Sequence, residues 1–389
     1  MKQRRFWGLL IGSLFFYSAC YNSENSEAGR VKNIYVDLTK IENEKPLNEY
    51  IDQVDFIRLE TTDSSLIRII SNLRVADRKI YIFDGSQGCI FVFDEKGKYL
   101  FKIDRLGRGP DEYSRILAFG IDQQNVIILG LSELVLYNKD NGDFVKKIRI
   151  TQKDFLPVEF QVDSSFYYFQ TADGLPTNKI QTTIVVYDKE EFTLQKGYTD
   201  PFYFKERPHV TSTVFIDSPY GVLFHQVLND TLYRLGEKGL EPLFFLNMGQ
   251  NQFTYQRYEE TPVDSKGKKV IPYKAVYPID EIVFTDKYLY FTCYQKTRDA
   301  VKYDVFWCFY RLDTGELKVF DENKLKEKSK YGTNVFDFDT VDKDGYFYVV
   351  CYPSILTYFR DKRGDQLDER YKEMQPEDNP WLMKYRLKL

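Results

Sequence analysis

Histidine and paired cysteine are scarce in this chain of 389 residues, which has 2 His, 5 Cys and no Cys-x-x-Cys pair. A zinc site made of thiolate and imidazole ligands therefore has little raw material, and we expect no metal and no cofactor. Basic residues are not in excess either, because the formal net charge is −4. Without a basic field to attract a phosphate backbone, nucleic acid is not an expected partner.

Short catalytic motifs are also absent. The sequence contains no Gly-x-Ser-x-Gly nucleophile elbow, no His-Glu-x-x-His helix and no Gly-x-x-x-x-Gly-Lys-Ser/Thr phosphate loop. We therefore assign no catalytic residue. This absence weighs less in a fold whose sites are assembled from loops far apart in the sequence, and paired carboxylates could come from many Asp and Glu residues.

A long apolar stretch occurs at the N-terminus, where a basic start (residues 2–5) precedes an apolar run (residues 6–17). The run is too short for a relaxed membrane span and ends in small residues before Cys20, as in a bacterial lipoprotein signal. We predict that residues 1–19 are a signal peptide and that Cys20 becomes the lipid-modified first residue of the mature chain.

Two features bear on this prediction. Tyr17 stands where lipoprotein signals usually have an aliphatic residue, so the alternative is an ordinary cleaved signal with an incidental Cys20. The polar residues that follow resemble a flexible tether, which we place at residues 20–32. The expected location is the cell envelope, as an outer-membrane lipoprotein held to the membrane by its lipid.

Aromatic residues are abundant, with 31 Tyr and 31 Phe, and they favour strands over helices. From Leu73 onward, short apolar runs alternate with Asp/Gly/Lys turns, and such short connections join antiparallel neighbours. The pattern recurs six times, at the spacing expected of propeller blades. The units contain the strands 80–83, 90–93 and 99–103; 126–129, 133–137 and 144–150; 166–170, 183–187 and 192–196; 221–225, 231–235 and 243–246; 282–284, 288–293, 305–312 and 317–320; and 346–351 and 356–359.

The sequence therefore predicts an all-β fold, a six-bladed β-propeller of four-stranded antiparallel blades that occupies residues 33–389 as a single domain. The last unit lacks an obvious outer strand, whereas residues 34–38 and 56–59 belong to no blade. We predict that one of these N-terminal strands completes the last blade, closes the ring and removes its exposed sheet edges.

Several motifs resemble those of the six-bladed β-propeller lipoproteins of the Bacteroidetes, which are related in pattern to NHL-repeat propellers. The motifs are Phe56-Ile57-Arg58-Leu59-Glu60-Thr61, Ile80-Tyr81-Ile82-Phe83-Asp84, Phe93-Asp94-Glu95-Lys96-Gly97, Gly107-Arg108-Gly109-Pro110-Asp111-Glu112-Tyr113 and Asn229-Asp230-Thr231-Leu232-Tyr233. The resemblance covers nearly the whole mature chain. It implies the fold and an exported lipoprotein, but no particular biochemical role.

The Gly107 loop (residues 107–113) joins one blade to the next. In propellers such connections lie on the face where the channel opens and ligands usually bind, so Arg108, Asp111, Glu112 and Tyr113 are candidate ligand-binding residues. The alternative is a turn that spaces two blades, with Tyr113 as a plug and its charges in solvent. Other aspartates stand at strand ends, where they are expected to accept backbone N–H groups: Asp84, Asp94 and Asp217.

His225 is a further candidate, because an inward turn after the strand 221–225 would place it near the channel. The alternative is a core or surface histidine, since His209 and His225 lack ligand spacing. Cys293 and Cys308 flank a turn-like segment and could form a disulfide, although free buried thiols are commoner. The insertion 250–277 is either functional or packed on the rim.

Two functions are compatible with these features. The first is a non-catalytic, monomeric binding protein of the cell envelope, whose partner is a glycan, a peptide or a protein. The second is a hydrolase or lyase that acts on carbohydrate or peptide at the mouth of the channel, because propellers host both chemistries. The scarcity of histidine and of catalytic motifs favours the binding protein.

Overall fold

In the computed structural model, part of the chain is described. The ranges are 31–42, 49–150, 156–171, 184–199, 215–226, 228–278, 281–299, 302–323, 338–354 and 368–388. The expected signal peptide, Cys20, His209 and the expected strand 356–359 lie outside these residues. Among the residues that the structure describes, no helix has both the length and the hydrophobicity that a membrane crossing requires.

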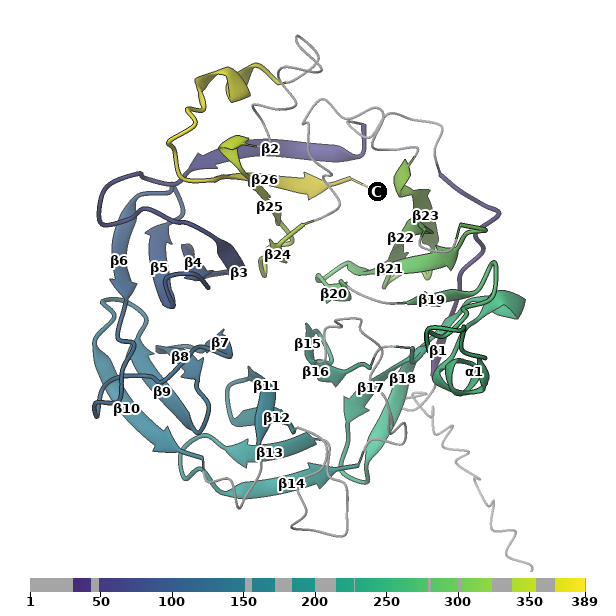
Figure 1. Ribbon diagram of the computed structural model, residues 1–389, viewed down its shortest axis with the longest axis horizontal. Coiled ribbons are helices and arrows are strands. Elements are labelled where there is room, and N and C mark those ends of the chain that lie inside the picture. The colour runs from purple at the N-terminus through teal and green to yellow at the C-terminus, as the bar shows by residue number, and fades with distance from the viewer. Residues whose placement is uncertain are drawn as a thin grey trace, which may run out of the picture.

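The strands form six antiparallel blades around a common axis, with β3, β7, β11, β15, β20 and β24 innermost (Figure 1). The sequence prediction of a six-bladed propeller is therefore confirmed. Blade 1 contains β3 (Ile70–Ala76), β4 (Lys79–Asp84), β5 (Cys89–Asp94) and β6 (Tyr99–Ile103). Blade 2 contains β7 (Ala118–Ile121), β8 (Asn125–Leu129), β9 (Glu133–Asn138) and β10 (Phe144–Arg149). Blade 3 contains β11 (Pro157–Val162), β12 (Phe166–Thr171), β13 (Ile184–Asp188) and β14 (Leu194–Tyr198).

The second half of the ring follows the same order with additions. Blade 4 contains β15 (Phe215–Ser218), β16 (Gly221–Phe224), β17 (Thr231–Leu235) and β18 (Leu240–Asn247). Blade 5 contains β19 (Val276–Pro278), β20 (Val283–Phe284), β21 (Tyr288–Lys296), β22 (Tyr303–Arg311) and β23 (Leu317–Asp321). Blade 6 contains β24 (Thr340–Val341), β25 (Phe347–Cys351), β26 (Trp381–Leu387) and β2 (Ile51–Arg58).

The composition of each strand follows from its place in the blade. Middle strands are covered on both faces by neighbouring blades, so β5 and β8 are nearly continuous apolar runs and are almost wholly buried. Outer strands meet solvent, and β10 accordingly reads Phe-Val-Lys-Lys-Ile-Arg with no fully buried residue. The burial pattern explains why the middle strands are the easiest to recognise in the sequence.

The N-terminal strand β2 closes the ring. It pairs antiparallel with β26, so that Phe56 lies opposite Met383 and Ile57 opposite Leu382. The Arg58 guanidinium lies over the Trp381 ring, 4.4 Å from its centroid. The prediction that an N-terminal strand completes the last blade is thus confirmed.

The first strand has a separate place. β1 (Lys32–Tyr35) runs parallel to β18 and adds a fifth strand to the outside of blade 4. The insertion that follows β18 contains the short helices η2 (Gly249–Asn251) and α1 (Tyr255–Glu260), and it packs through a small apolar cluster around Phe253 and Tyr277. A further short helix, η4 (Glu369–Glu373), precedes β26.

Each pair of neighbouring blades shares a buried apolar cluster, including the pair formed by blade 6 and blade 1. In the last of these pairs, Tyr348 and Leu382 of blade 6 pack with Ile82 and Phe91 of blade 1. Apolar burial is therefore continuous around the ring, and no blade hides its faces alone.

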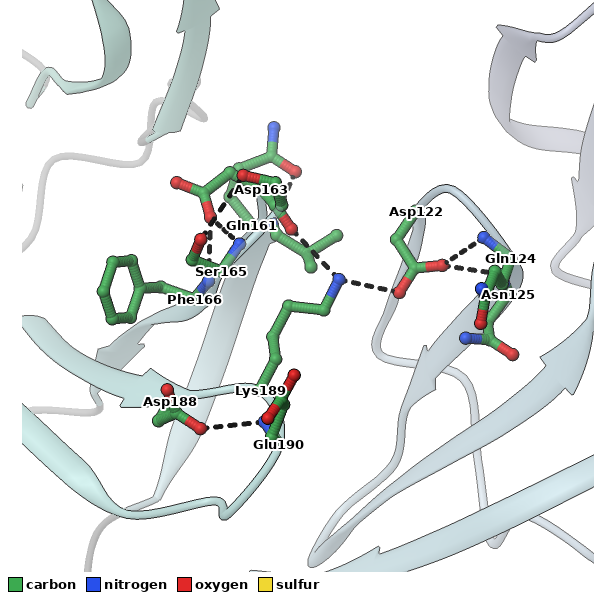
Figure 2. Close-up of polar contacts among 12 residues, drawn as sticks. Asp122, Gln124, Asn125, Gln161, Asp163, Ser165, Phe166, Asp188, Lys189 and Glu190 are labelled. Atoms are coloured by element: carbon green, nitrogen blue, oxygen red, sulfur yellow. Dashed lines mark hydrogen bonds and ion pairs between the residues drawn. The ribbon is translucent and has the colours of Figure 1, made fainter.

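Ion pairs between hairpins of neighbouring blades supplement this packing. Figure 2 shows Lys189, which follows β13, reaching to Asp122, which follows β7, with 2.9 Å between Nζ and Oδ2. Lys189 also donates to the Asp163 carbonyl at 3.1 Å. Burial opposes ionisation of Asp122, but the Lys189 ammonium and the backbone N–H groups of Gln124 and Asn125 hold the pKa of that carboxyl below its usual value.

The cysteines among the described residues, Cys89, Cys293, Cys308 and Cys351, are buried free thiols. Cys293 and Cys308 lie on β21 and β22 with 3.7 Å between their sulfur atoms, and each pairs across the strands with a phenylalanine rather than with the other. Of the two alternatives that the sequence left open for this pair, the structure has the free thiols.

Candidate functional site

The Gly107 loop connects β6 to β7 and is built around the carboxylate of Glu112. Glu112 Oε2 accepts the Gly109 N–H at 2.6 Å. A Cβ on Gly107 would lie 2.0 Å from the same oxygen, so any larger residue there would displace the Glu112 carboxylate from this position. Lys147 on β10 donates to the carbonyl groups of Gly109 and Glu112, which ties the loop to blade 2.

Tyr113 is the plug between blades 1 and 2. Its side chain is fully buried, and its hydroxyl donates to the carbonyl oxygens of Gly88 at 2.8 Å and Ile103 at 3.2 Å. Its ring meets the Tyr137 ring edge to face, with the centroids 6.2 Å apart. Burial raises the pKa of Tyr113 far above its usual value. This candidate residue therefore faces the protein interior rather than the loop surface.

The charged residues of the Gly107 loop differ in whether they have a hydrogen-bond or ion-pair partner. Asp111 pairs with the Arg105 guanidinium, and its carbonyl accepts the Tyr137 hydroxyl at 2.7 Å. Arg108 is exposed and, within the described ranges, has no hydrogen bond or ion pair. Arg149, at the end of β10, is exposed in the same way. Two guanidinium groups on this face of blades 1 and 2 are thus available to an anion.

Both arginines line one surface cleft with a volume of about 530 Å³. The cleft contains three cationic side chains, those of Arg108, Lys147 and Arg149, and a single carboxylate, that of Glu133. Two serine hydroxyls also border it, and the complete lining is Gly107, Arg108, Gly109, Pro110, Ser114, Ser132, Glu133, Lys147, Arg149 and Ile150. We call this depression the blade 1–2 cleft.

The carboxylate of the blade 1–2 cleft is already engaged. Glu133 is buried and accepts the Ser114 N–H at 3.0 Å and the Ser114 hydroxyl. Burial works against its ionisation, but these hydrogen bonds hold the pKa of Glu133 below its usual value. Because Glu133 is already hydrogen-bonded within the protein, the charged groups left to bind a ligand in the cleft are cationic. No local sequence pattern marks Arg149 or Lys147 as site residues.

His225 lies away from the Gly107 loop. It follows β16 and is completely buried, with Nε2 2.9 Å from the Asn229 carbonyl oxygen. Its Nδ1 is buried with no hydrogen-bond partner in the described part of the chain. Burial lowers the pKa of His225 to about 4, so the ring is neutral at ordinary pH. Four of the five sequence candidates therefore share one loop, and His225 lies in the core.

A second group of polar residues, which the sequence did not single out as a site, lies on innermost strands of three blades. We call it the axial cluster: Arg74 on β3, Glu159 and Gln161 on β11, and Asp217 on β15. Gln161 Nε2 donates to Asp217 Oδ2 at 2.9 Å. Asp84 and Asp94 accept backbone N–H groups, as expected, whereas Asp217 instead faces this cluster.

The two carboxyls of the axial cluster, Glu159 and Asp217, ionise less readily than free carboxyls. Burial, the largest cause, raises the pKa of Glu159 and that of Asp217, and the Arg74 guanidinium acts in the opposite direction on both. Asp217 is nevertheless exposed to solvent, and Arg74 and Glu159 are half-buried. Carboxyls that have a raised pKa and are still accessible to solvent are typical of functional sites.

Comparison with known proteins identifies relatives by fold. Residues 32–386 match a family model described as a domain of unknown function, DUF4934. No curated protein matches the chain. A candidate exported protein from Bacteroides fragilis is 16% identical, with a TM-score of 0.72 over 92% of this chain and 100% of that one. A member of the DUF4221 family from Bacteroides vulgatus is 10% identical, with a TM-score of 0.53 over 87% of this chain and 97% of that one.

Proposed function

This chain belongs to the DUF4934 family, and we propose that it is an exported, non-catalytic binding protein of the cell envelope whose ligand is anionic and occupies the blade 1–2 cleft. The observation that carries the proposal is the pair of exposed guanidinium groups, Arg108 and Arg149, in a cleft whose one carboxylate is already hydrogen-bonded. Arginine matches carboxylate and sulfate groups through paired N–H donors.

The location forms part of the same proposal. The basic start and apolar run before Cys20 support export and a lipid anchor, and the fold shared with a candidate exported protein from Bacteroides fragilis is compatible with them. The relation in pattern to NHL-repeat propellers, the outer-membrane location and the monomeric state belong to this proposal too. A glycan, a peptide or a protein could supply the anionic groups, so the experiment includes each kind of anion.

The test measures binding to anionic and neutral polymers by titration calorimetry. Heparin, polygalacturonate and poly-L-glutamate are the anionic probes, and dextran is the neutral one. We expect at least one anionic probe to bind, with an affinity that falls as salt is added, because exposed charges are screened. Arg108→Gln with Arg149→Gln should weaken this binding by tenfold or more, since each lost charge-assisted hydrogen bond is worth about 1.5 kcal/mol or more.

The matched control changes two exposed arginines that already have acidic partners, Arg234 and Arg311. Arg234→Gln with Arg311→Gln alters the net charge equally but leaves the cleft intact. Equal loss of binding in both double variants would show that the net charge of the protein, and not the blade 1–2 cleft, determines binding. Preference for dextran, or full binding by the Arg108 and Arg149 variant, would refute the proposed cleft.

A further inference from the structure

The insertion between β18 and β19 carries a cleft of its own, with a volume of about 480 Å³. Every residue that lines it belongs to the segment 250–275, whose helix α1 lies at the periphery of the ring (Figure 1). Phe253 packs against Tyr277 of β19, and the Tyr255 N–H donates to the Leu228 carbonyl of blade 4 at 3.0 Å. The insertion is therefore anchored to blades 4 and 5, and we call its depression the insertion cleft.

The backbone of the insertion cleft is already hydrogen-bonded within the protein. The N–H groups of Phe253, Thr261 and Ala275 donate to carbonyl groups at 2.8, 3.1 and 3.1 Å. The Arg257 guanidinium donates to the Gln252 carbonyl at 2.6 Å, and the two prolines of the lining have no N–H to offer. A peptide that binds as an added strand needs a row of free backbone groups, and these positions do not supply one.

Side chains of the insertion cleft, in contrast, are available to a ligand. Tyr273 is 52% exposed, and its ring is held by the Arg298 guanidinium and the Lys274 ammonium group, which lie 5.3 and 5.7 Å from the centroid. Gln250 and Asn251 are exposed, and their side-chain amides have no hydrogen bond within the described ranges. The cleft thus combines an accessible aromatic ring with two unpartnered amides.

The charges of the lining balance. One cation, Arg257, and one carboxylate, Glu260, border the insertion cleft, and the remaining lining residues are uncharged. An amide offers both donors and an acceptor, as a pair of hydroxyl groups requires. A ligand that matches the cleft is therefore uncharged, with a flat apolar face for the Tyr273 ring and hydroxyl groups for the amides. A sugar ring has this combination, since its C–H groups form the faces and its hydroxyls the edge.

We propose that the insertion cleft binds a neutral, β-linked oligosaccharide. One sugar ring stacks on Tyr273, and the amides of Gln250 and Asn251 bind the hydroxyl groups at its edge. A β-linked glucose unit suits a single aromatic ring, because its hydroxyls and its glycosidic bonds are equatorial and leave both faces flat. This site is separate from the blade 1–2 cleft and does not depend on the anionic ligand proposed there.

The test is titration calorimetry of the folded mature protein with cellotetraose and laminaritetraose, which are β-linked glucose chains. Maltotetraose is the matched control, because its axial glycosidic oxygens obstruct one face of each ring. We expect at least one β-linked chain to bind, about fivefold or more tightly than maltotetraose. No binding of either β-linked chain, or equal or tighter binding of maltotetraose, would overturn the proposal.

Two further probes test other classes of ligand. N-acetyl-tetraalanine amide is an uncharged peptide, and hyaluronan tetrasaccharide is a β-linked acidic glycan. The acidic glycan is measured on the variant Arg108→Gln with Arg149→Gln, so that the blade 1–2 cleft does not contribute. Tighter binding of either probe than of the β-linked glucose chains would overturn the proposal.

Variants assign the roles. Tyr273→Ala should weaken binding of the β-linked chain about tenfold or more, whereas Tyr273→Phe, which keeps the ring, should retain it. Asn251→Ala should weaken it as well. Phe144→Ala removes an exposed ring from β10 and should leave binding unchanged, as should Arg108→Gln with Arg149→Gln. Unchanged binding in Tyr273→Ala, or equal losses in Tyr273→Ala and Phe144→Ala, would overturn the site. Should a variant fail to fold, the comparison of β-linked and α-linked chains on the unaltered protein still decides.

Discussion

The imidazole of His225 is kept neutral by its surroundings. The ring is completely buried, its Nε2 is paired with the Asn229 carbonyl, and its Nδ1 has no partner in the described residues. Adding a proton would place a charge in an apolar setting, and this cost lowers the pKa to about 4. A histidine with this environment stabilises the core only while it is uncharged.

We expect His225 to make the protein sensitive to acid. Its pKa in the folded protein, about 4, lies below the ordinary value of 6.5, so its contribution is fully present above pH 6.5 and is lost as the pH falls toward 4. The loss is at most about 3 kcal/mol. Unfolding by urea at pH 7, 6, 5 and 4 should show a shallower pH dependence for His225→Gln than for the unaltered protein.

The control for this measurement is His209→Gln, which removes the other histidine of the sequence. It should retain the pH dependence of the unaltered protein. Identical curves for His225→Gln and the unaltered protein would show that the His225 ring is not the group whose protonation is opposed by folding.

Individual loop residues were harder to place than the loop itself. Tyr113 and Arg108 stand five positions apart in one turn, yet the tyrosine fills the interior while the arginine lines the blade 1–2 cleft. The alternative that Tyr113 plugs the space between blades describes its position, and its ligand-binding role stays a prediction. Arg149 could not be predicted as a site residue, because it lines the blade 1–2 cleft together with Arg108, which is 41 positions away in the sequence.

At the scale of strands, burial decides which strands can be predicted from the sequence. The middle strands β4, β5, β8 and β9 are covered on both faces and have apolar centres with polar residues at their ends, so their ranges agree closely with those expected. The strand β26 was not predicted, because it follows a polar stretch and one of its two partners, β2, is more than 300 residues away. The pairing of β1 with β18 carries no sequence signal either.

The strand β2 is expected to matter more than β1. A chain that begins at Thr61 lacks β2, so the backbone edge of β26 and the apolar residues beside it are exposed. This protein should melt at a lower temperature than the mature chain and should aggregate, as measured by thermal unfolding and light scattering. The control chain begins at Ile41 and lacks only β1, which extends a blade that is already complete.

The comparison of the two truncated chains is the informative result. If both are equally stable and monodisperse, then β2 does not hold the ring together. If the chain without β1 is the less stable of the two, the contacts of β1 with blade 4 outweigh ring closure.

At the scale of the molecule, the six blades form one closed unit in which every pair of neighbouring blades shares a buried apolar cluster. The inner strands of this ring face the axis, whereas the blade 1–2 cleft lies beside the connection from β6 to β7, so the axial cluster and the blade 1–2 cleft use different parts of one scaffold. A tether from Cys20 to β1 would hold this ring at a membrane surface.

We expect Cys20→Ser to release the protein from the membrane. A single acyl chain binds a bilayer weakly and more than one binds it stably, so removing the proposed acylation site should move the protein from the membrane fraction to the soluble fraction. Fractionation and immunoblotting of cells that express each form would show this. A serine variant that stays with the membrane would contradict the lipid anchor, and Cys351→Ser, which alters a buried thiol, serves as the control.

The sequence by itself determined the number of blades and most of the middle strands, because both depend on local apolar periodicity and on turns between neighbouring strands. It also indicated the closure of the ring, because the last unit lacked an outer strand and an N-terminal strand belonged to no blade. Only the tertiary structure decided which polar groups meet. The Gln161 amide reaches the Asp217 carboxyl because β11 and β15 are inner strands of neighbouring blades, and Arg108 and Arg149 line one cleft where two blades pack. Contacts of this kind depend on the relative placement of whole blades, which no short segment encodes.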